Sequence, residues 1–323
     1  MSVVTSRGLR VPRYRIGTST IRDHAPGGSS GVRSKAVPAK DDDPVTLGLA
    51  AARATLDGSD VDAVYFATAT PLYTYGSATP LLTEALGLDE ATEVRTFTES
   101  NRAGTAALGA AADAADARGQ TVLVVAADVP TPAQGSDREK TAGAGAGAVV
   151  IEPGGDGLAF VGRGSCTRNL LEAWQAPEDE QRHEADDRFA RDIGYVESTV
   201  RAVERAVDAA GWANEDVDAL VVNQPNPRFP GRISRELGLH DDAVAGPGFA
   251  SQYGDLGSAS ALAVLSWAEL GEGDRVVVGS YGAGVADAYS LRVEGRPPSP
   301  SANPAEPERL GYVEYLQHIG HLE

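Results

Sequence analysis

The strongest constraint on the fold of this chain is an internal duplication. The segment VDAVYFATAT at 61–70 returns as VDALVVNQPN at 217–226, a spacing of 156 residues from 61 to 217, and each copy follows a helical pattern. Two helices rich in small residues are expected next, at 100–119 and 254–273. Each precedes a Val-rich strand, at 121–129 or 275–284, and a closing strand near 146–153 or 287–294. Features that recur at a nearly constant offset indicate two copies of one unit.

The order of these elements predicts an α/β architecture. The Val-rich segments lack alternation, as is typical of strands covered on both faces, and strand–helix–strand order favours parallel pairing. Two half-units that each bury a central helix predict a five-layered αβαβα sandwich. We expect an N-terminal half at 1–162 and a C-terminal half at 163–323, the latter with a polar insertion at 163–192 and a C-terminal tail after a Pro-rich connection at 295–309. A Rossmann-type repeat is the alternative, but no GxGxxG motif follows a first strand.

The charge balance narrows the environment and the partners. Net charge is -18, and the 28 basic residues include only the lysines Lys35, Lys40 and Lys140. An Asp-, Glu- and Arg-rich surface with few lysines resembles the proteins of salt-loving archaea, in which high ionic strength screens the repulsion between carboxylates. Such a field disfavours a nucleic-acid backbone. The alternative is an acidic face that binds a partner protein.

Other residue classes set further expectations. Cys166 is the only cysteine, which excludes an internal disulfide, and the five histidines are scattered without carboxylates at ligand spacing, so no metal site is expected. The first residues are interrupted by arginines and a proline and lack the apolar core of a signal peptide, and no stretch is apolar enough to span a bilayer. We therefore expect a cytoplasmic protein with no membrane partner.

Six segments together resemble one family. They are RVPRYRI near the start, SNRAGTAAL, NQPNPRFPGRISRELGL, YGDLGSAS, GSYGAGVADAYSLRV and LGYVEYLQHIGHL at the end. On these motifs the chain resembles the archaeal 3-hydroxy-3-methylglutaryl-CoA synthases of the thiolase and ketoacyl-synthase superfamily. The resemblance runs from about residue 8 to the last residue. It implies the thiolase fold, an acyl-CoA ligand and no separate cofactor.

The chemistry of that family needs a cysteine nucleophile, a histidine and a glutamate. Aligned on the motifs, this chain has Asn101 at the cysteine position, Asn223 at the histidine position and Ala69 at the glutamate position. Asparagine caps a helix well but forms no thiolate, and it carries no proton at neutral pH. The usual acyl-enzyme route is therefore closed in the form that the family uses.

Other residues are candidates for the same site. Asp255 stands where the family has asparagine, and two interpretations apply: a desolvated base for an acyl-CoA α-proton, or a cap for the helix that follows. The turn from Ser280 to Gly284 resembles the family's oxyanion turn, whose backbone N–H groups polarise a thioester. Ser100 is interpreted as a capping hydroxyl and Cys166 as a small core residue. The resemblance implies substrate contacts from Asn226, Ser280, Gly282 and Gly284, with Arg102 and Arg228 as a basic rim.

Two functions remain open at this point, and whether the chain is an enzyme depends on which holds. The first is a non-catalytic or weakly catalytic partner in a thiolase-type complex. The second is an acyltransferase, decarboxylase or thioesterase with altered catalytic residues. The resemblance also implies a homodimer in which the strand at 121–127 pairs across a two-fold axis, and thiolase and zinc-ribbon/OB-fold proteins as further partners.

Overall fold

The structure is a computed structural model that describes residues 1–25, 31–56, 58, 60–98, 100–176, 178–179, 183–299 and 306–322. Its main feature is a nine-stranded sheet in the order β11-β12-β13-β8-β1-β7-β6-β4-β5. This sheet consists of two half-sheets that join where Val3 and Val4 of β1 pair with Ala159 and Leu158 of β8. The duplication seen in the sequence is therefore a duplication of half-sheets.

In the described residues, the first half-sheet has five strands, and three helices cover it. The strands are β1 (Val3–Arg10), β4 (Ala63–Ala67), β5 (Glu93–Phe97), β6 (Val122–Asp128) and β7 (Gly145–Glu152). Helices α2 (Pro44–Thr55) and α3 (Thr79–Leu86) cover the outer face, and α4 (Ala103–Arg118) covers the inner face. Asp43 begins α2 with a capping box, because its carboxylate accepts from the backbone of Thr46 while Thr46 Oγ1 accepts from the backbone of Asp43.

The second half repeats this plan in shortened form. Its strands are β8 (Gly157–Thr167), β11 (Ala219–Val222), β12 (Arg275–Gly282) and β13 (Val285–Glu294). Its helices are α7 (Glu197–Ala209), α8 (Phe229–Leu237), α9 (Phe249–Tyr253) and α10 (Ser260–Trp267), with 3₁₀ turns at Asn214–Asp216 and Gly257–Ala259. The counterpart of β5 is reduced to a single bridge between Leu220 and Val244.

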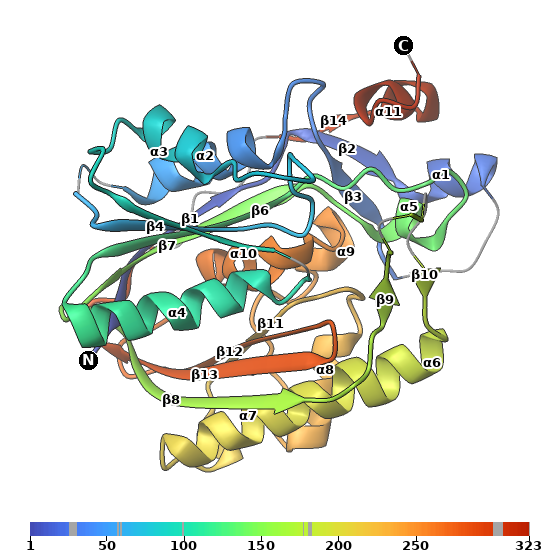
Figure 1. Cartoon of the computed structure of the whole chain (residues 1–323). Helices are drawn as coiled ribbons and strands as arrows, with labels where there is room; N and C mark the ends of the chain where they lie inside the picture. The colour runs from blue at the N-terminus through green and yellow to red at the C-terminus, as the bar shows by residue number, and fades with distance from the viewer. Residues whose placement is uncertain are drawn as a thin grey trace.

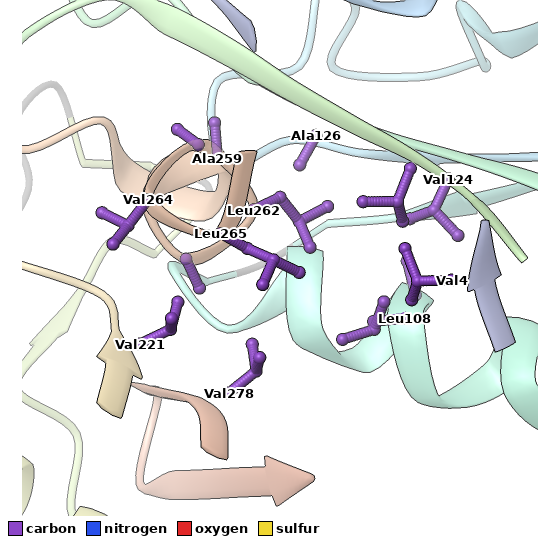
Figure 2. Close-up of a cluster of buried hydrophobic side chains, with 14 of the residues drawn as sticks. Val4, Leu108, Val124, Ala126, Val221, Ala259, Leu262, Val264, Leu265 and Val278 are labelled. Atoms are coloured by element: carbon purple, nitrogen blue, oxygen red, sulfur yellow. The ribbon is translucent and has the colours of Figure 1, made fainter. Parts of the chain in front are cut away.

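The predicted layers are confirmed. Figure 1 shows α2 and α3 on one outer side, α7 and α8 on the other, and α4 and α10 between the two half-sheets. Figure 2 shows the core that these two central helices share, in which Leu108, Leu262 and Val278 are fully buried. Each such side chain contributes about 1.5–3 kcal/mol relative to an exposed one. The sequence of α4 is small and apolar on nearly every side because the helix is enclosed.

The close packing of the central helices depends on one glycine. A Cβ at Gly104 of α4 would lie 2.3 Å from the carbonyl oxygen of Ser258, which belongs to the turn before α10. Because the obstacle is backbone, no rotamer change relieves it. Gly104 therefore sets the approach of the two duplicated helices.

The expected strand directions are only partly correct. β4 runs parallel to β5 and β6, and β11 runs parallel to β12, as predicted. β7 is antiparallel to β6, and β13 is antiparallel to β12. The chain reaches β13 from β12 through a tight turn, and reaches β7 from β6 through a loop with only the short helix α5 (Asp137–Thr141). Connections of this kind return the chain antiparallel, whereas a parallel neighbour needs a crossover.

Two other expectations are corrected. The boundary at 162/163 falls inside β8, which pairs with β13 from Gly157 to Thr167 and so belongs to the second half. The strand at 121–127 corresponds to β6, and β6 has β4 on one side and β7 on the other. It has no free edge for a partner subunit, and the edge strand of this half-sheet is β5.

Smaller elements surround the two halves. A three-stranded sheet joins β2 (Tyr14–Gly17), β3 (Ser34–Val37) and β14 (Glu308–Arg309), and it lies beside helices α1 (Thr18–His24) and α11 (Tyr312–His318). The polar insertion contains β9 (Ala173–Trp174), β10 (His183–Glu184), α6 (Asp187–Phe189) and a π-helix at Ala190–Val196. Within the described residues, no helix has the length and apolar character that crossing a bilayer requires.

Candidate functional site

A cavity of about 490 Å³ lies between the two halves and the polar insertion. Three residues that sequence reasoning selected meet there: Asn101 at the start of α4, Asn223 after β11, and Asp255 before α10. Asn226 and Arg228 also line it. Ala69, Arg102, Ser280, Gly282 and Gly284 are not among its lining residues.

Asn101 lies at the N-terminal end of α4, in the turn that precedes the helix. The backbone N–H of Arg102 donates to Ser100 Oγ at 3.3 Å, so this hydroxyl stabilises the turn before the helix. It does not cap α4 as expected, because the N-cap residue is Arg102, whose side chain makes no capping hydrogen bond. A Cβ at Gly282 of β12 would lie 3.0 Å from the backbone nitrogen of Asn101. The absence of a side chain at Gly282 therefore lets the end of β12 approach the N-terminus of α4.

Asn223 is 1% exposed and its side chain is fixed to the neighbouring strand. Its Oδ1 accepts from the backbone N–H of Tyr281 at 3.1 Å, and its Nδ2 donates to the carbonyl oxygen of Tyr281 at 3.1 Å. The hydroxyl of Tyr195 donates to the carbonyl oxygen of Asn223. The amide thus extends the pairing of β11 with β12 by one residue. This geometry gives Asn223 a structural task at the cavity wall.

Asp255 closes a turn that also lines the cavity. Its Oδ1 accepts from the backbone N–H of Gly257 at 3.0 Å, which satisfies a donor at the start of the 3₁₀ turn leading into α10. Its backbone bonds to Thr141 and Gly143, and so ties this turn to the loop after α5. The negative charge of Asp255 adds to burial in raising the pKa of Tyr195 well above its usual value. Asp255 therefore stabilises the turn that leads to α10 and lines the cavity, while the N-cap residues of the 3₁₀ turn and of α10 are Leu256 and Ala259.

Ala69 lies in a loop organised by one buried carboxylate. Asp128, at the end of β6, accepts from the backbone N–H groups of Ala69 at 2.7 Å and Thr70 at 2.9 Å, and from Thr68 Oγ1 at 2.9 Å. Its other oxygen accepts from the N–H of Ser258 at 2.6 Å. Burial raises the pKa of Asp128, and these donors act in the opposite direction. Asp128 thus connects the loop after β4 in the first half with the turn before α10 in the second. It was not among the residues selected from the sequence.

The turn from Ser280 to Gly284 differs from the expectation in one respect. Ala283 and Gly284 both have left-handed backbone, with φ of 51° and 78°, and form the tight connection from β12 to β13. The N–H of Ala283 donates to Oε1 of Glu172 at 2.9 Å. A donor of the turn that would polarise a thioester is therefore engaged by a carboxylate. Ser280 is buried, and its hydroxyl has no hydrogen-bond partner among the described residues.

The charged residues at the cavity include several that sequence reasoning missed. Glu172 and Glu184 come from the polar insertion, and Arg138 and Lys140 come from α5. Lys140 is buried, with Nζ 3.4 Å from Asp137 Oδ1. The expected rim residue Arg102 instead pairs with Asp287 at 2.5 Å, whereas Arg228 is exposed at the cavity.

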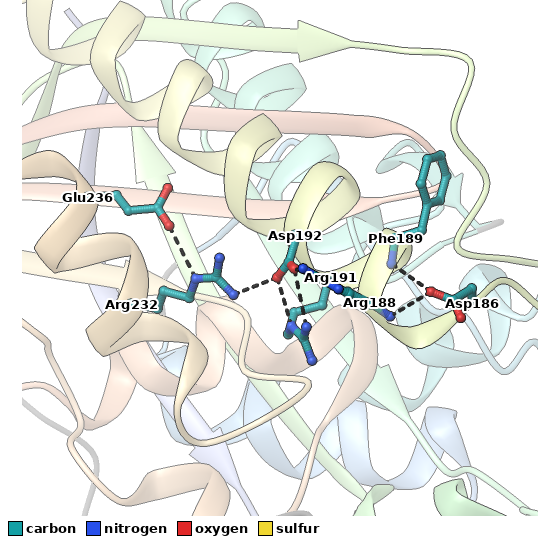
Figure 3. A network of polar contacts seen from close by, with 7 residues as sticks. All are labelled: Asp186, Arg188, Phe189, Arg191, Asp192, Arg232 and Glu236. Carbon is teal, nitrogen blue, oxygen red and sulfur yellow. Dashed lines mark hydrogen bonds and ion pairs between the residues drawn. The ribbon is translucent and has the colours of Figure 1, made fainter.

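A network of arginines and carboxylates holds one side of the cavity (Figure 3). Asp192 of the π-helix contacts Arg191 Nε at 2.8 Å and Arg232 Nη1 of α8 at 2.5 Å. These contacts, the bond from Arg191 foremost, lower the pKa of Asp192 to about 2. The π-helix carries the lining residues Ala190, Arg191 and Tyr195, and α8 begins with the lining residue Phe229. The network therefore fixes two lining elements relative to each other.

In the described ranges, Cys166 belongs to the core of the second half. No group of three or more His, Cys, Asp or Glu residues in these ranges has an arrangement that would hold a metal ion. Cys166 is buried on β8, where it pairs with Ala286 and packs in the core of the second half. The lone cysteine thus lies away from the start of α4, as a small core residue would.

Comparisons with known proteins agree with this architecture. Residues 207–292 match the family model described as 3-oxoacyl-[acyl-carrier-protein] synthase III C terminal. A hydroxymethylglutaryl-CoA synthase of Pyrococcus horikoshii is 31% identical over 90% of this chain and 86% of its own length. One from Methanopyrus kandleri is 30% identical over 91% and 88%.

Solved structures show the same fold at lower sequence identity. A structure described as MvaS in complex with 3-hydroxy-3-methylglutaryl coenzyme A superposes with a TM-score of 0.82 at 19% identity, covering 100% of this chain and 92% of that one. The 3-oxoacyl-(acyl carrier protein) synthase III of Pseudomonas aeruginosa PAO1 has a TM-score of 0.81 at 22% identity, covering 92% and 99%.

Proposed function

The chain belongs to the hydroxymethylglutaryl-CoA synthase family, and on that premise we propose that it binds an acyl-CoA between its halves without the family's usual Cys/His/Glu chemistry. In this proposal it acts as a non-catalytic or weakly catalytic member of a thiolase-type assembly. The observation that carries the proposal is the bonding of Asn223, whose amide is held on both sides by Tyr281. A residue held in this way extends a strand, and an amide transfers no proton at neutral pH.

The cavity retains features that suit a CoA thioester. Arg138 and Arg228 line it, and neither has an ion-pair partner among the described residues. On a chain with a net charge of -18, such cations are the natural contacts for the CoA phosphates. The structure described as hydroxymethylglutaryl-CoA synthase complexed with CoA, at a TM-score of 0.82, supports a ligand of this class.

Titration calorimetry with CoA and acetyl-CoA tests the binding part of the proposal. Arg228→Ala should weaken binding of both ligands about tenfold or more, as loss of a charge-assisted phosphate contact would. Arg235→Ala is the matched control, because Arg235 lies on α8 (which begins directly after Arg228), donates to the carbonyl oxygen of Gly231 and is not among the cavity-lining residues. Equal loss in both variants, or no binding by the native chain, would overturn the acyl-CoA site.

An acyl-CoA enzyme with altered chemistry is the second candidate, and the position of Asp255 favours it. Asp255 lines the cavity together with Asn101, where a base would meet an acyl group. In a decarboxylase or thioesterase it would need to act while its Oδ1 accepts the backbone N–H of Gly257. Mass spectrometry of malonyl-CoA and acetoacetyl-CoA mixtures decides between the two: turnover abolished by Asp255→Ala supports the enzyme, whereas binding without turnover supports the non-catalytic partner.

The partner proteins remain part of the proposal. The edge strand β5 exposes Val94, and the segment from β4 through helix α3 exposes further large apolar side chains: Leu72, Tyr73, Tyr75 and Leu81. An exposed edge with apolar neighbours suits pairing with a second copy of the chain. Light scattering of the native protein and of Val94→Asp tests the homodimer. Co-purification from cells tests the thiolase and zinc-ribbon/OB-fold proteins that the family resemblance implies.

A further inference from the structure

Glu172 lies between the polar insertion and the turn that ends β12. Its Oε1 accepts the backbone N–H of Ala283 at 2.9 Å, and its side chain lines the same cavity as Asn101. Gly282, the residue before Ala283, packs against the backbone of Asn101 at the N-terminus of α4. The carboxylate therefore engages a backbone donor next to the helix end, where an acyl group would be received.

This contact is held in place by its surroundings. A Cβ at Gly284 would lie 2.4 Å from the carbonyl oxygen of Arg168 and 2.7 Å from that of Leu170. The N–H of Arg168 donates to the carbonyl oxygen of Gly284 at 2.8 Å, and the hydroxyl of Tyr281 donates to that of Leu170 at 3.2 Å. The segment from Arg168 to Leu170, which leads into Glu172, therefore packs closely against the turn from β12 to β13. The backbone bond between Arg168 and Gly284 places the Glu172 carboxylate next to the N–H of Ala283.

The charge of Glu172 is not neutralised by an ion pair. The nearby cation Arg168 pairs with Glu197 at 2.8 Å. Within the described ranges Glu172 has no ion pair, and beside the bond from Ala283 its carboxylate interacts with the hydroxyl of Tyr281. The negative charge acts on its neighbours, since burial and then Glu172 raise the pKa of Tyr281. A ligand carbonyl oxygen placed beside the Ala283 N–H would find this donor already bonded to Glu172. The negative carboxylate would also repel the partial negative charge of the carbonyl oxygen.

We propose that Glu172 is a specificity-determining residue that makes the cavity favour free CoA over acyl-CoA. This inference rests on the proposed function, because it presupposes that CoA binds here. The thioester carbonyl is the group that distinguishes the two ligands next to the helix end. To place that carbonyl against the Ala283 N–H, an acyl-CoA must displace the carboxylate, whereas free CoA makes no such demand.

The test compares the affinities of CoA and acetyl-CoA by titration calorimetry. In Glu172→Ala, the Kd of acetyl-CoA divided by that of CoA should fall about tenfold, the effect of about 1.4 kcal/mol expected from freeing one hydrogen-bond donor from a charged competitor. Glu172→Gln keeps the shape and removes the charge, so it should shift the ratio in the same direction by less. Glu184→Ala is the matched control, because Glu184 lines the same cavity from β10 and makes no bond to Ala283.

The outcomes separate the two proposals. If CoA binds to every variant but the ratio is unchanged in Glu172→Ala, or changes equally in Glu184→Ala, this inference is overturned and the acyl-CoA site stands. If neither ligand binds to the native chain or to any variant, the proposed function is overturned and the inference with it. A thermal melt of each variant, unchanged from the native protein, establishes that the ratio reports the site.

Discussion

The side chain of Asn223 and the backbone of Tyr281 exchange two hydrogen bonds, each 3.1 Å long, at the wall of the cavity. An asparagine amide makes this exchange because it has a donor and an acceptor side by side. The family resemblance assigns this position to a histidine, and the two bonds give the asparagine here a different, structural task. Because both bonds are buried, replacing Asn223 should change the free energy of unfolding by a measurable amount.

Asn223→Ala should lower the free energy of unfolding by roughly 2–4 kcal/mol, because it leaves the N–H and the carbonyl of Tyr281 buried without partners. Urea denaturation measures this loss. Asn226→Ala serves as the control, since the bond from Arg228 N to its Oδ1 is exposed and its removal should cost less than about 1 kcal/mol. Equal losses in the two variants would show that the exchange with Tyr281 is not what holds β12.

A cysteine at position 101 should be reactive but insufficient for synthesis. In Asn101→Cys the thiol would lie at the N-terminus of α4, where the helix dipole favours the thiolate. Iodoacetamide labelling followed by peptide mass spectrometry should modify residue 101 well before Cys166, which is 5% exposed. Formation of 3-hydroxy-3-methylglutaryl-CoA by this variant alone would contradict the assignment of Asn223 and Ala69 as lost functional positions.

Gly104→Ala should destabilise the protein by about 1–3 kcal/mol, because the added methyl meets the carbonyl of Ser258 and forces α4 away from α10. Gly231→Ala in α8 is the matched control, since a Cβ there meets nothing within 4 Å. That control should be neutral or stabilise by up to about 1 kcal/mol through helix propensity. A melt in which both variants behave alike would contradict the close approach of the duplicated helices.

The pH dependence of stability should reveal a buried lysine. Burial lowers the pKa of Lys35 to about 7, while Glu139 acts in the opposite direction and Arg138 adds to the decrease. Its Nζ lies 2.9 Å from the hydroxyl of Tyr315, whose own pKa burial raises. Between about pH 7 and the ordinary lysine pKa near 10.4, the unfolded chain binds more protons than the folded one, so this group makes stability rise with pH.

Thermal melts of the native protein and of Lys35→Met across that range test this sign. The native protein should gain stability relative to the variant as pH rises from about 7 to about 9.5. Lys40→Met is the control, because Lys40 is exposed and should leave the native profile unchanged. Parallel profiles for the native protein and Lys35→Met would show that Lys35 keeps its charge in the folded state.

The acidic composition predicts stabilisation by salt. With a net charge of -18, the surface carboxylates repel one another at low ionic strength, and screening lengths fall from about 10 Å at 0.1 M to about 3 Å at 1 M. The melting temperature should therefore rise steadily between about 0.1 M and about 2 M KCl. A melting temperature that is flat or falls over this range would contradict the resemblance to proteins of salt-loving archaea.

The layers and the cavity floor could be predicted from the sequence because they follow from repetition. The segments that begin at 61 and 217 place Asn223 at the end of a buried strand, and the small-residue helices place Asn101 and Asp255 before the two central helices. The directions of β7 and β13 could not be predicted in this way. The direction of β13 depends on the tight turn that the positive φ of Ala283 and Gly284 makes, and that of β7 on a loop that contains only the short helix α5.

The charged residues of the site were harder to predict. Glu172 contacts Ala283 across 111 residues, from an insertion that has no counterpart in the first half and no local motif. Lys140 and Arg138 lie in a five-residue helix, and the sequence of this segment alone predicts a loop. Arg102 follows Asn101 directly, yet it turns away to Asp287, because neighbouring residues at a helix start point in different directions.

Intact-protein mass spectrometry after incubation with acetyl-CoA and acetoacetyl-CoA, with the CoA products measured in the same sample, tests whether the chain works without the family's acyl-enzyme step. We expect an unmodified chain and no 3-hydroxy-3-methylglutaryl-CoA, under conditions where calorimetry shows that CoA ligands bind. An acetylated chain together with formation of 3-hydroxy-3-methylglutaryl-CoA would contradict this expectation. That result would mean that the family's reaction proceeds without a cysteine at position 101.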